Sequence, residues 1–254
     1  MSILTREFDN ERSAIIEPSY CATKNDGMPQ IAVATFSYKL IEKFSKLENV
    51  KAIGKIKSSN CENIIYKINY KDTDIAFFLA RVGAPACTID FEEIIAMGVK
   101  KLVLFGSCGV LSKDIPNGHI IVPTCAVRDE GTSYHYIYPS DEINLQDDSI
   151  KTIASTLDEL NYPYVKGKIW TTDAPYRETV TKLNNRKNQG CIAVEMECAA
   201  MAAVAQFRNI QFAQFLYSAD NLDAVKWEPR GLGNTKLSQK EIYMAIALEC
   251  AMNL

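Results

Sequence analysis

The chain has 254 residues, 47% hydrophobic and 23% charged, a composition that is ordinary for a globular protein and sufficient for a large core. Its 28 basic and 31 acidic residues give a net charge of −3 without a cluster of lysines or arginines, which argues against a nucleic-acid partner. The N-terminus has no apolar signal core and no apolar run is long enough to span a bilayer, so we expect a cytoplasmic protein with no membrane partner.

The first half of the chain alternates short apolar runs with helical patterns. We expect a strand over 31–36, a helix over 37–47, strands over 64–70 and 74–83, a helix over 86–99 and a strand over 100–109.

The second half continues the alternation. We expect strands over 118–131, 164–173 and 212–220, helices over 148–161 and 238–254, and a strand running into a helix over 190–207. No linker or repeat divides the chain, so residues 1–254 are predicted to form one domain. Strands alternating with helices predict a three-layer α/β/α fold around a central mixed, largely parallel sheet.

The eight cysteines are scattered, and most have apolar neighbours. None forms a Cys-x-x-Cys pair and the chain has only two histidines, so a zinc site is not expected. The cysteines fit a reducing compartment, where they act as small apolar fillers.

Oddly placed polar residues gather where the predicted strands end. Ligands of open α/β sheets bind beyond the carboxyl ends of the strands, so this clustering indicates a site. The segments are Arg81–Gly83, Gly106–Gly109, Arg128–Tyr136, Thr171–Arg177, Glu195–Glu197 and Ser218–Asp220.

The sequence Gly-Ser-Cys-Gly at 106–109 follows an apolar strand. Glycines let a ligand approach the main-chain N–H groups and Ser107 adds a hydroxyl, which suits an anion or a sugar oxygen. No Gly-Lys-Ser/Thr follows, so this is not a P-loop. A tight turn without a ligand is the alternative.

Two acids, Glu195 and Glu197, interrupt the apolar stretch over 190–207. Burying an unpaired carboxylate costs several kcal/mol, so such groups need a partner. A carboxylate at a strand–helix junction can accept hydrogen bonds from two vicinal ribose hydroxyls. A helix cap or a buried salt bridge is the alternative.

Asp220 ends the last predicted strand, where burial would raise its pKa and suit it to donate a proton. An ordinary turn after a strand is the alternative. The segment 128–136, with His135, combines charge, hydroxyls and aromatic rings. It suits a loop that contacts a ligand, although it could also be a surface turn.

Four stretches, "VKKLVLFGSCGVLSKDIPNGHIIVPTCAVRDEGTSYHY", "GKIWTTDAPY", "GCIAVEMECAAM" and "SAD", follow one another as they do in nucleoside phosphorylases. The chain resembles the branch with bacterial purine nucleoside phosphorylases, uridine phosphorylases and methylthioadenosine/adenosylhomocysteine nucleosidases. The resemblance covers residues 74 to 254 well and the first third loosely. It implies a phosphorylase-like fold and cleavage of an N-glycosidic bond, with inorganic phosphate as co-substrate and no cofactor.

The resemblance also implies residue roles. Glu197 would hold the ribose hydroxyls, with Met196 against the sugar, and Asp220 would protonate or hydrogen-bond N7 of a leaving purine; these two acids are the predicted catalytic residues. Glu195 is more structural in this interpretation. The predicted substrate-binding residues are Ser107, Cys108, Gly109, Met196, Glu197, Tyr176, Arg177 and Val82. The predicted phosphate-binding residues are Ser107, Gly106, Arg81, Arg128 and Lys39.

Two departures concern the phosphate site. Phosphorolytic members carry Gly-Asp-Pro-x-Arg after the first strand, where this chain has Ala-Thr-Phe-Ser-Tyr-Lys at 34–39, and an arginine where it has Leu104. A hydrolytic nucleosidase and a non-catalytic nucleoside-binding protein are therefore alternatives to a phosphorylase.

The base preference also stays open. Asp220 favours a purine, and the Gln-x-Arg pattern of uridine-specific members is absent, but Arg177 could approach a pyrimidine oxygen. The resemblance further implies a homodimer, or a hexamer built as a trimer of dimers.

Overall fold

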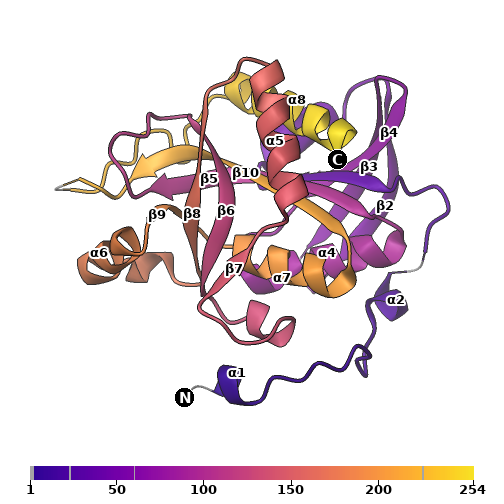
Figure 1. The fold of residues 1–254 in the computed structure, drawn as a ribbon. Coiled ribbons are helices and arrows are strands. Elements are labelled where there is room, and N and C mark those ends of the chain that lie inside the picture. Colours follow the sequence, from indigo (N-terminus) through magenta and orange to yellow (C-terminus); the bar gives the residue numbers. More distant parts are fainter. Residues whose placement is uncertain (1–2, 23, 60, 225) are drawn as a thin grey trace.

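The computed structural model describes residues 3–22, 24–59, 61–224 and 226–254 (Figure 1). The strands in this part are β1 (Ile31–Thr35), β2 (Val50–Lys57), β3 (Glu62–Tyr70), β4 (Thr73–Leu79), β5 (Lys101–Val110), β6 (Ile120–Asp129), β7 (Glu142–Asn144), β8 (Tyr164–Thr172), β9 (Cys191–Glu195) and β10 (Gln211–Asn221). The helices are α1 (Ile3–Arg6), α2 (Pro18–Cys21), α3 (Tyr38–Phe44), α4 (Ala84–Met97), α5 (Asp147–Glu159), α6 (Val180–Asn188), α7 (Cys198–Arg208) and α8 (Leu237–Asn253), with short 3₁₀ turns η1 (Ser133–His135) and η2 (Pro175–Arg177).

All the strands belong to one mixed sheet. Strands β4, β1, β5 and β10 run parallel side by side, and so do β6, β8 and β9. Antiparallel pairs β10–β6 and β5–β9 join the two sets, so β5, β10, β6, β8 and β9 close into a ring. The antiparallel strands β3 and β2 extend the sheet beyond β4.

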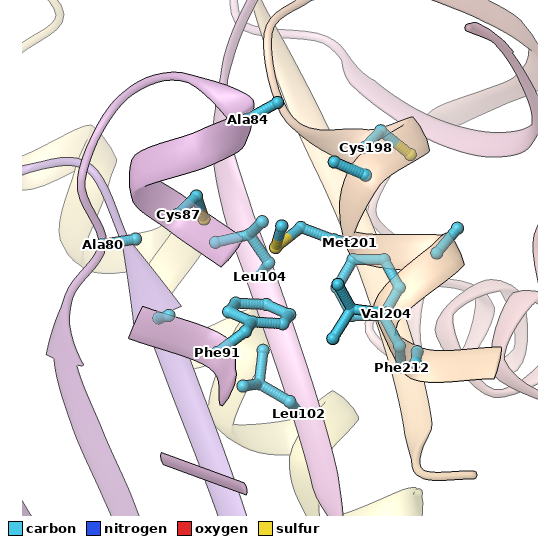
Figure 2. Close-up of a cluster of buried hydrophobic side chains, with 14 of the residues drawn as sticks. Ala80, Ala84, Cys87, Phe91, Leu102, Leu104, Cys198, Met201, Val204 and Phe212 are labelled. Atoms are coloured by element: carbon cyan, nitrogen blue, oxygen red, sulfur yellow. The ribbon is translucent and has the colours of Figure 1, made fainter. Parts of the chain in front are cut away.

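Helices cover both faces of the sheet, and the predicted three-layer α/β/α fold is confirmed. In Figure 1, α4 and α7 lie on one side of the sheet, and α5 and α8 on the other. Figure 2 shows the first layer, where Phe91 of α4 and Met201 of α7 meet over Leu104 of β5. The second face buries Leu157 of α5 and Tyr243 of α8. Burying each large apolar side chain contributes roughly 1.5–3 kcal/mol.

Helix α7 is buried because its sequence is apolar around the whole helix. Every residue from 198 to 205 is buried, and five of these eight are alanines, which let α4 and α7 pack closely. The main chain before α7 is thus held firmly, and it carries Glu195 and Glu197. Among the described residues, no helix is long and apolar enough to cross a membrane.

Several elements were not predicted from the sequence: α1, α2, β2, β7 and α6. Strand β2 buries only Ile56, and α6 buries nothing, so neither has the apolar periodicity that indicates a core element.

Candidate active site

One edge of β5 is left open between two neighbouring strands. Strand β1 pairs with β5 up to the contact of Thr35 with Phe105, and β9 pairs with it only from Gly109 onward. In the described part of the chain, residues 106–108 have no ladder partner on this edge. The main-chain N–H and C=O groups that point to this edge are therefore available to a ligand, whereas the other edge of these residues is paired with β10.

The chain ends of β1 and β9 approach this opening from opposite directions. Strand β9 is antiparallel to β5 and ends at Glu195, and the chain bends at 196 and 197, so Glu197 lies just past the end of β9. Strand β1 is parallel to β5 and ends at Thr35, and the chain bends at Phe36 before α3 begins. A Cβ on Gly106 would lie 2.6 Å from Cδ2 of Phe36, so only glycine fits beneath this ring.

Asp220 lies on the opposite edge of β5. It is paired with Gly109, after a bulge between Ser218 and Asp220. A Cβ on Gly109 would lie 3.2 Å from Oδ1 of Asp220 and 2.4 Å from Leu222, so the glycine permits this close approach. The three residue steps from Gly106 to Gly109 span about 10 Å along the strand. The fold thus brings the chain ends that carry Glu197 and Asp220 to the two edges of β5 along this stretch.

Glu195 has a structural role. Its carboxylate accepts hydrogen bonds from the Thr171 hydroxyl at 2.6 Å and from the main-chain N–H groups of Glu197 and Cys198 at 2.8 and 2.7 Å. It thereby caps the N-terminus of α7, where a negative charge is favourable. This agrees with the structural interpretation of the first acid.

Glu197 is buried but forms no salt bridge with any described residue. It accepts one hydrogen bond of 2.6 Å from the N–H of Gly83, which is at a positive φ of 95° before α4. Burial, and then the nearby Glu195 carboxyl, raise the pKa of Glu197, while the Gly83 N–H acts in the opposite direction. The carboxyl therefore has hydrogen-bonding capacity left for a ligand.

Asp220 interacts with two side chains that the sequence analysis did not single out. Trp227 donates its indole N–H to Oδ2 at 2.8 Å. Burial raises the pKa of Asp220, while Trp227 and Arg230 act in the opposite direction. Burial and the charge of Asp220 raise the pKa of Glu178 to about 7. The pKa of Asp220 is therefore shifted in the direction expected for a proton donor.

The other predicted substrate residues differ in how far their side chains are buried. The Ser107 side chain is exposed at the opening, whereas Cys108 is buried, with its thiol 3.7 Å from the carbonyl of Tyr217. Burial raises the pKa of that thiol, so only the main chain of Cys108 can line the site. Met196 is half-buried.

Three more predicted substrate residues are exposed. The exposed fraction is 62% for Val82, which precedes Gly83, and 99% for Tyr176 on η2. Arg177, also on η2, is exposed. None of the three is held in place by packing.

Two predicted phosphate ligands are corrected by the structure. Arg128 is only 3% exposed, and its guanidinium donates to the hydroxyls of Ser133 and Ser140 and to the carbonyls of Ile137 and Tyr138. It organises the loop over 128–140 and is not directed to an anion. The same loop lines a groove with Gly131, Thr132, His135 and Tyr136, so its expected contact with a ligand stays a prediction.

Arg81 pairs with the fully buried Asp90, with Nε 2.8 Å and Nη2 2.7 Å from Oδ1. Its charge is thus neutralised inside the protein. Lys39, in contrast, is exposed on α3. The sequence analysis missed Lys240, whose ammonium lies 3.4 Å from the Ser37 hydroxyl, because no spacing rule connects residues 37 and 240.

A groove of about 760 Å³ lies beside the site. It is lined by the N-terminal segment, the start of α4 and residues 131–136, and it reaches Asp173. The charge of Asp173 contributes to the raised pKa of Glu197, so the groove borders the sugar end of the site.

Comparisons with known proteins agree with this architecture. The family model described as "Phosphorylase superfamily" matches residues 27–241. A guanosine phosphorylase of Halorubrum lacusprofundi is 27% identical over 154 residues, which cover 61% of this chain and 64% of that protein. The match thus spans less than two thirds of that relative.

Two solved structures have the same fold. A purine nucleoside phosphorylase from Toxoplasma gondii has a TM-score of 0.75 at 20% identity, covering 89% of this chain and 91% of the other. A uridine phosphorylase from Vibrio fischeri has a TM-score of 0.75 at 21% identity, covering 95% and 98%. The family match over most of the chain shows that this protein belongs to the phosphorylase superfamily.

Proposed function

We propose that the protein is a nucleoside phosphorylase that cleaves the N-glycosidic bond of a nucleoside, with a preference for purines. The observation that supports this most directly is the arrangement of two acids around β5: Asp220 pairs with Gly109 on one edge, and Glu197 follows β9, which pairs with the other edge. Two acids placed in this way suit a ligand with hydroxyls at one end and a basic nitrogen at the other.

In the proposed reaction, a phosphate oxygen forms a bond to C1′ as the bond from C1′ to the base nitrogen breaks. The electron pair of that bond leaves with the base, and Asp220 delivers a proton or a hydrogen bond to N7. Glu197 accepts hydrogen bonds from the ribose hydroxyls and stabilises the positive charge that develops on the sugar. The products are the free base and ribose-1-phosphate, or deoxyribose-1-phosphate from a deoxynucleoside.

The direction of one pKa shift supports these roles. Burial raises the pKa of Asp220 above its ordinary value, which is the direction expected for a proton donor. The preference for a purine depends on this acid, because N7 is its expected partner. A relative named for guanosine and a structure named for purine nucleosides are similar to this chain, and so is a structure named for uridine. The base preference is therefore tested by measurement.

The test is turnover of inosine, guanosine, adenosine and uridine with and without inorganic phosphate. We expect base release only with phosphate, and fastest with a purine nucleoside. Base release at the same rate without phosphate would establish the hydrolytic alternative, which is motivated by Leu104 and by the missing Gly-Asp-Pro-x-Arg motif. Nucleoside binding without any base release would establish the non-catalytic alternative.

We also propose a homo-oligomer, a dimer or a hexamer, that acts in the cytoplasm. The eight cysteines are all unpaired, which supports a reducing compartment. Light scattering of the purified protein measures the oligomeric state, and a monomeric mass would refute this part of the proposal.

A further inference from the structure

The two faces of β5 differ at the opening. Leu104 and Cys108 face the core beneath α4 and α7, whereas Phe105 faces the opposite core, beneath α8. Because side chains alternate along a strand, Ser107 is on the α8 side. Tyr217, the partner of Ser107 in β10, stacks on Tyr243 of α8 with ring centroids 4.4 Å apart. Ser107 is therefore linked to α8 through these two rings.

The end of β1 blocks one approach to the turn and leaves the other open. The Phe36 ring lies directly against Gly106. An anion at this turn must therefore approach from the Ser107 side. Ser37 follows this ring as the N-cap of α3, with φ −100° and ψ 96°, so it lies where the chain turns from β1 into that helix.

Lys240 brings a positive charge to the same place. It precedes Tyr243 by three residues, so the two share one face of α8. Its ammonium lies 3.4 Å from the Ser37 hydroxyl. Burial, and then the positive charge of Lys39, lower the pKa of Lys240. Two cations therefore face the same region.

No described carboxylate lies within salt-bridge distance of Lys240. The adjacent Glu241 pairs with Lys43 instead. Two like charges near the Ser37 hydroxyl, with no salt-bridge partner for Lys240 among the described residues, form a place where an anion lowers the electrostatic energy.

We propose that Lys240, Lys39, Ser37 and Ser107 bind the inorganic phosphate dianion, with the C-terminal helix α8 supplying the principal cation. This rests on the proposed phosphorylase activity and names the ligands of its phosphate. The site replaces Arg81 and Arg128, whose guanidinium groups are engaged elsewhere. Lysine binds phosphate as a point charge and needs no bidentate geometry, so its flexible side chain suits a partly open site.

The test uses two variants. Lys240→Met keeps a side chain of similar length and removes the charge, and Lys240→Arg keeps the charge. The control is Lys151→Met, because Lys151 is an exposed lysine on α5 and has no role in the site. Binding of inorganic phosphate alone is measured by calorimetry, and the KM for phosphate is measured with the best nucleoside. We expect Lys240→Met to lower the affinity for phosphate, and to raise the KM for phosphate, each roughly tenfold or more, since a charge-assisted hydrogen bond is lost. Lys240→Arg should restore most of the affinity, and the KM for nucleoside should change little.

Two outcomes overturn the proposal, and they are distinguishable. If the unmodified protein binds phosphate and Lys240→Met binds it equally well, the lysine is not a ligand, while the phosphorylase activity stands. If the unmodified protein neither binds phosphate nor needs it for base release, the site and the phosphorylase proposal both fail. Circular dichroism of each variant establishes that α8 is still folded.

Discussion

Replacing Glu197 by Gln tests the sugar-binding role, because the side chain keeps its size but can no longer ionise. Burial raises the pKa of Glu197 to about 8, so the kinetics are measured above that pH. The carboxylate accepts a hydrogen bond from the Gly83 N–H and is proposed to accept two more from ribose hydroxyls. Hydrogen bonds to a charged group contribute about 1.5–3 kcal/mol each, and neutral ones about half as much. The substitution should therefore cost about 2–3 kcal/mol of transition-state stabilisation, which is roughly a 30- to 150-fold fall in kcat/KM.

The matched control is Glu195→Gln, two residues earlier. An amide oxygen can replace only part of the three hydrogen bonds that Glu195 accepts from Thr171 and from the N–H groups that open α7. We expect a loss of stability of about 1–3 kcal/mol, which lowers Tm by roughly 2–4 °C per kcal/mol in a chain of this size. Steady-state kinetics and thermal unfolding of both variants measure whether Glu197→Gln mainly lowers kcat/KM and Glu195→Gln mainly lowers Tm. If Glu197→Gln keeps its kcat/KM within about threefold of the unmodified enzyme, the sugar-binding role is wrong.

The same pair predicts the pH dependence of stability. Both glutamates have a pKa raised by burial above the ordinary 4.5. Between 4.5 and the raised values, the folded protein binds more protons than the unfolded chain, so stability should fall as pH rises through this window. Glu197→Gln removes one of the two groups and should flatten this slope. Urea unfolding across the window measures it, and a slope of opposite sign would contradict the protonation states assigned here.

Three further substitutions test the remaining parts of the site. Asp220→Asn should slow the release of ordinary purines roughly 100-fold, and much less for a nucleoside whose base leaves without protonation; equal losses would remove its role as an acid. Gly109→Ala places a methyl group 2.4 Å from Leu222 and should lower both Tm and activity, so an unchanged Tm would show that this contact relaxes easily. Arg128→Met should lower Tm and leave the KM for phosphate unchanged, whereas a selective rise in that KM would restore the original prediction for this arginine.

The sequence predicted the elements that have strong apolar periodicity. The strand expected over 100–109 spans Lys101–Val110, and the helix expected over 238–254 spans Leu237–Asn253. The apolar residues of the strand face two opposite cores and those of the helix pack in one of them, which is why the pattern indicated both the elements and the layered fold.

The site could be predicted only in part, because local patterns do not report distant contacts. The strand ends carrying Glu197 and Asp220 were recognisable, since acids are unusual beside apolar runs. The pairing of Arg81 with Asp90 was not predicted, although the two residues are only nine positions apart. An arginine near a strand end is equally suited to an ion pair and to an anion site. The contact of Lys240 with Ser37 and the closure of the strand ring join segments far apart in the chain, and only the folded structure shows them.

The position of β2 at the end of the sheet bears on self-association. Its outer edge offers unpaired main-chain groups to which a strand of another molecule could add. Three lysines, at 51, 55 and 57, lie along this strand, and a bulge between Ala52 and Gly54 disturbs its regular spacing. Repulsion between like charges and the irregular backbone oppose continuous pairing between copies, so the protein should resist fibril formation along this edge and use another surface for any assembly.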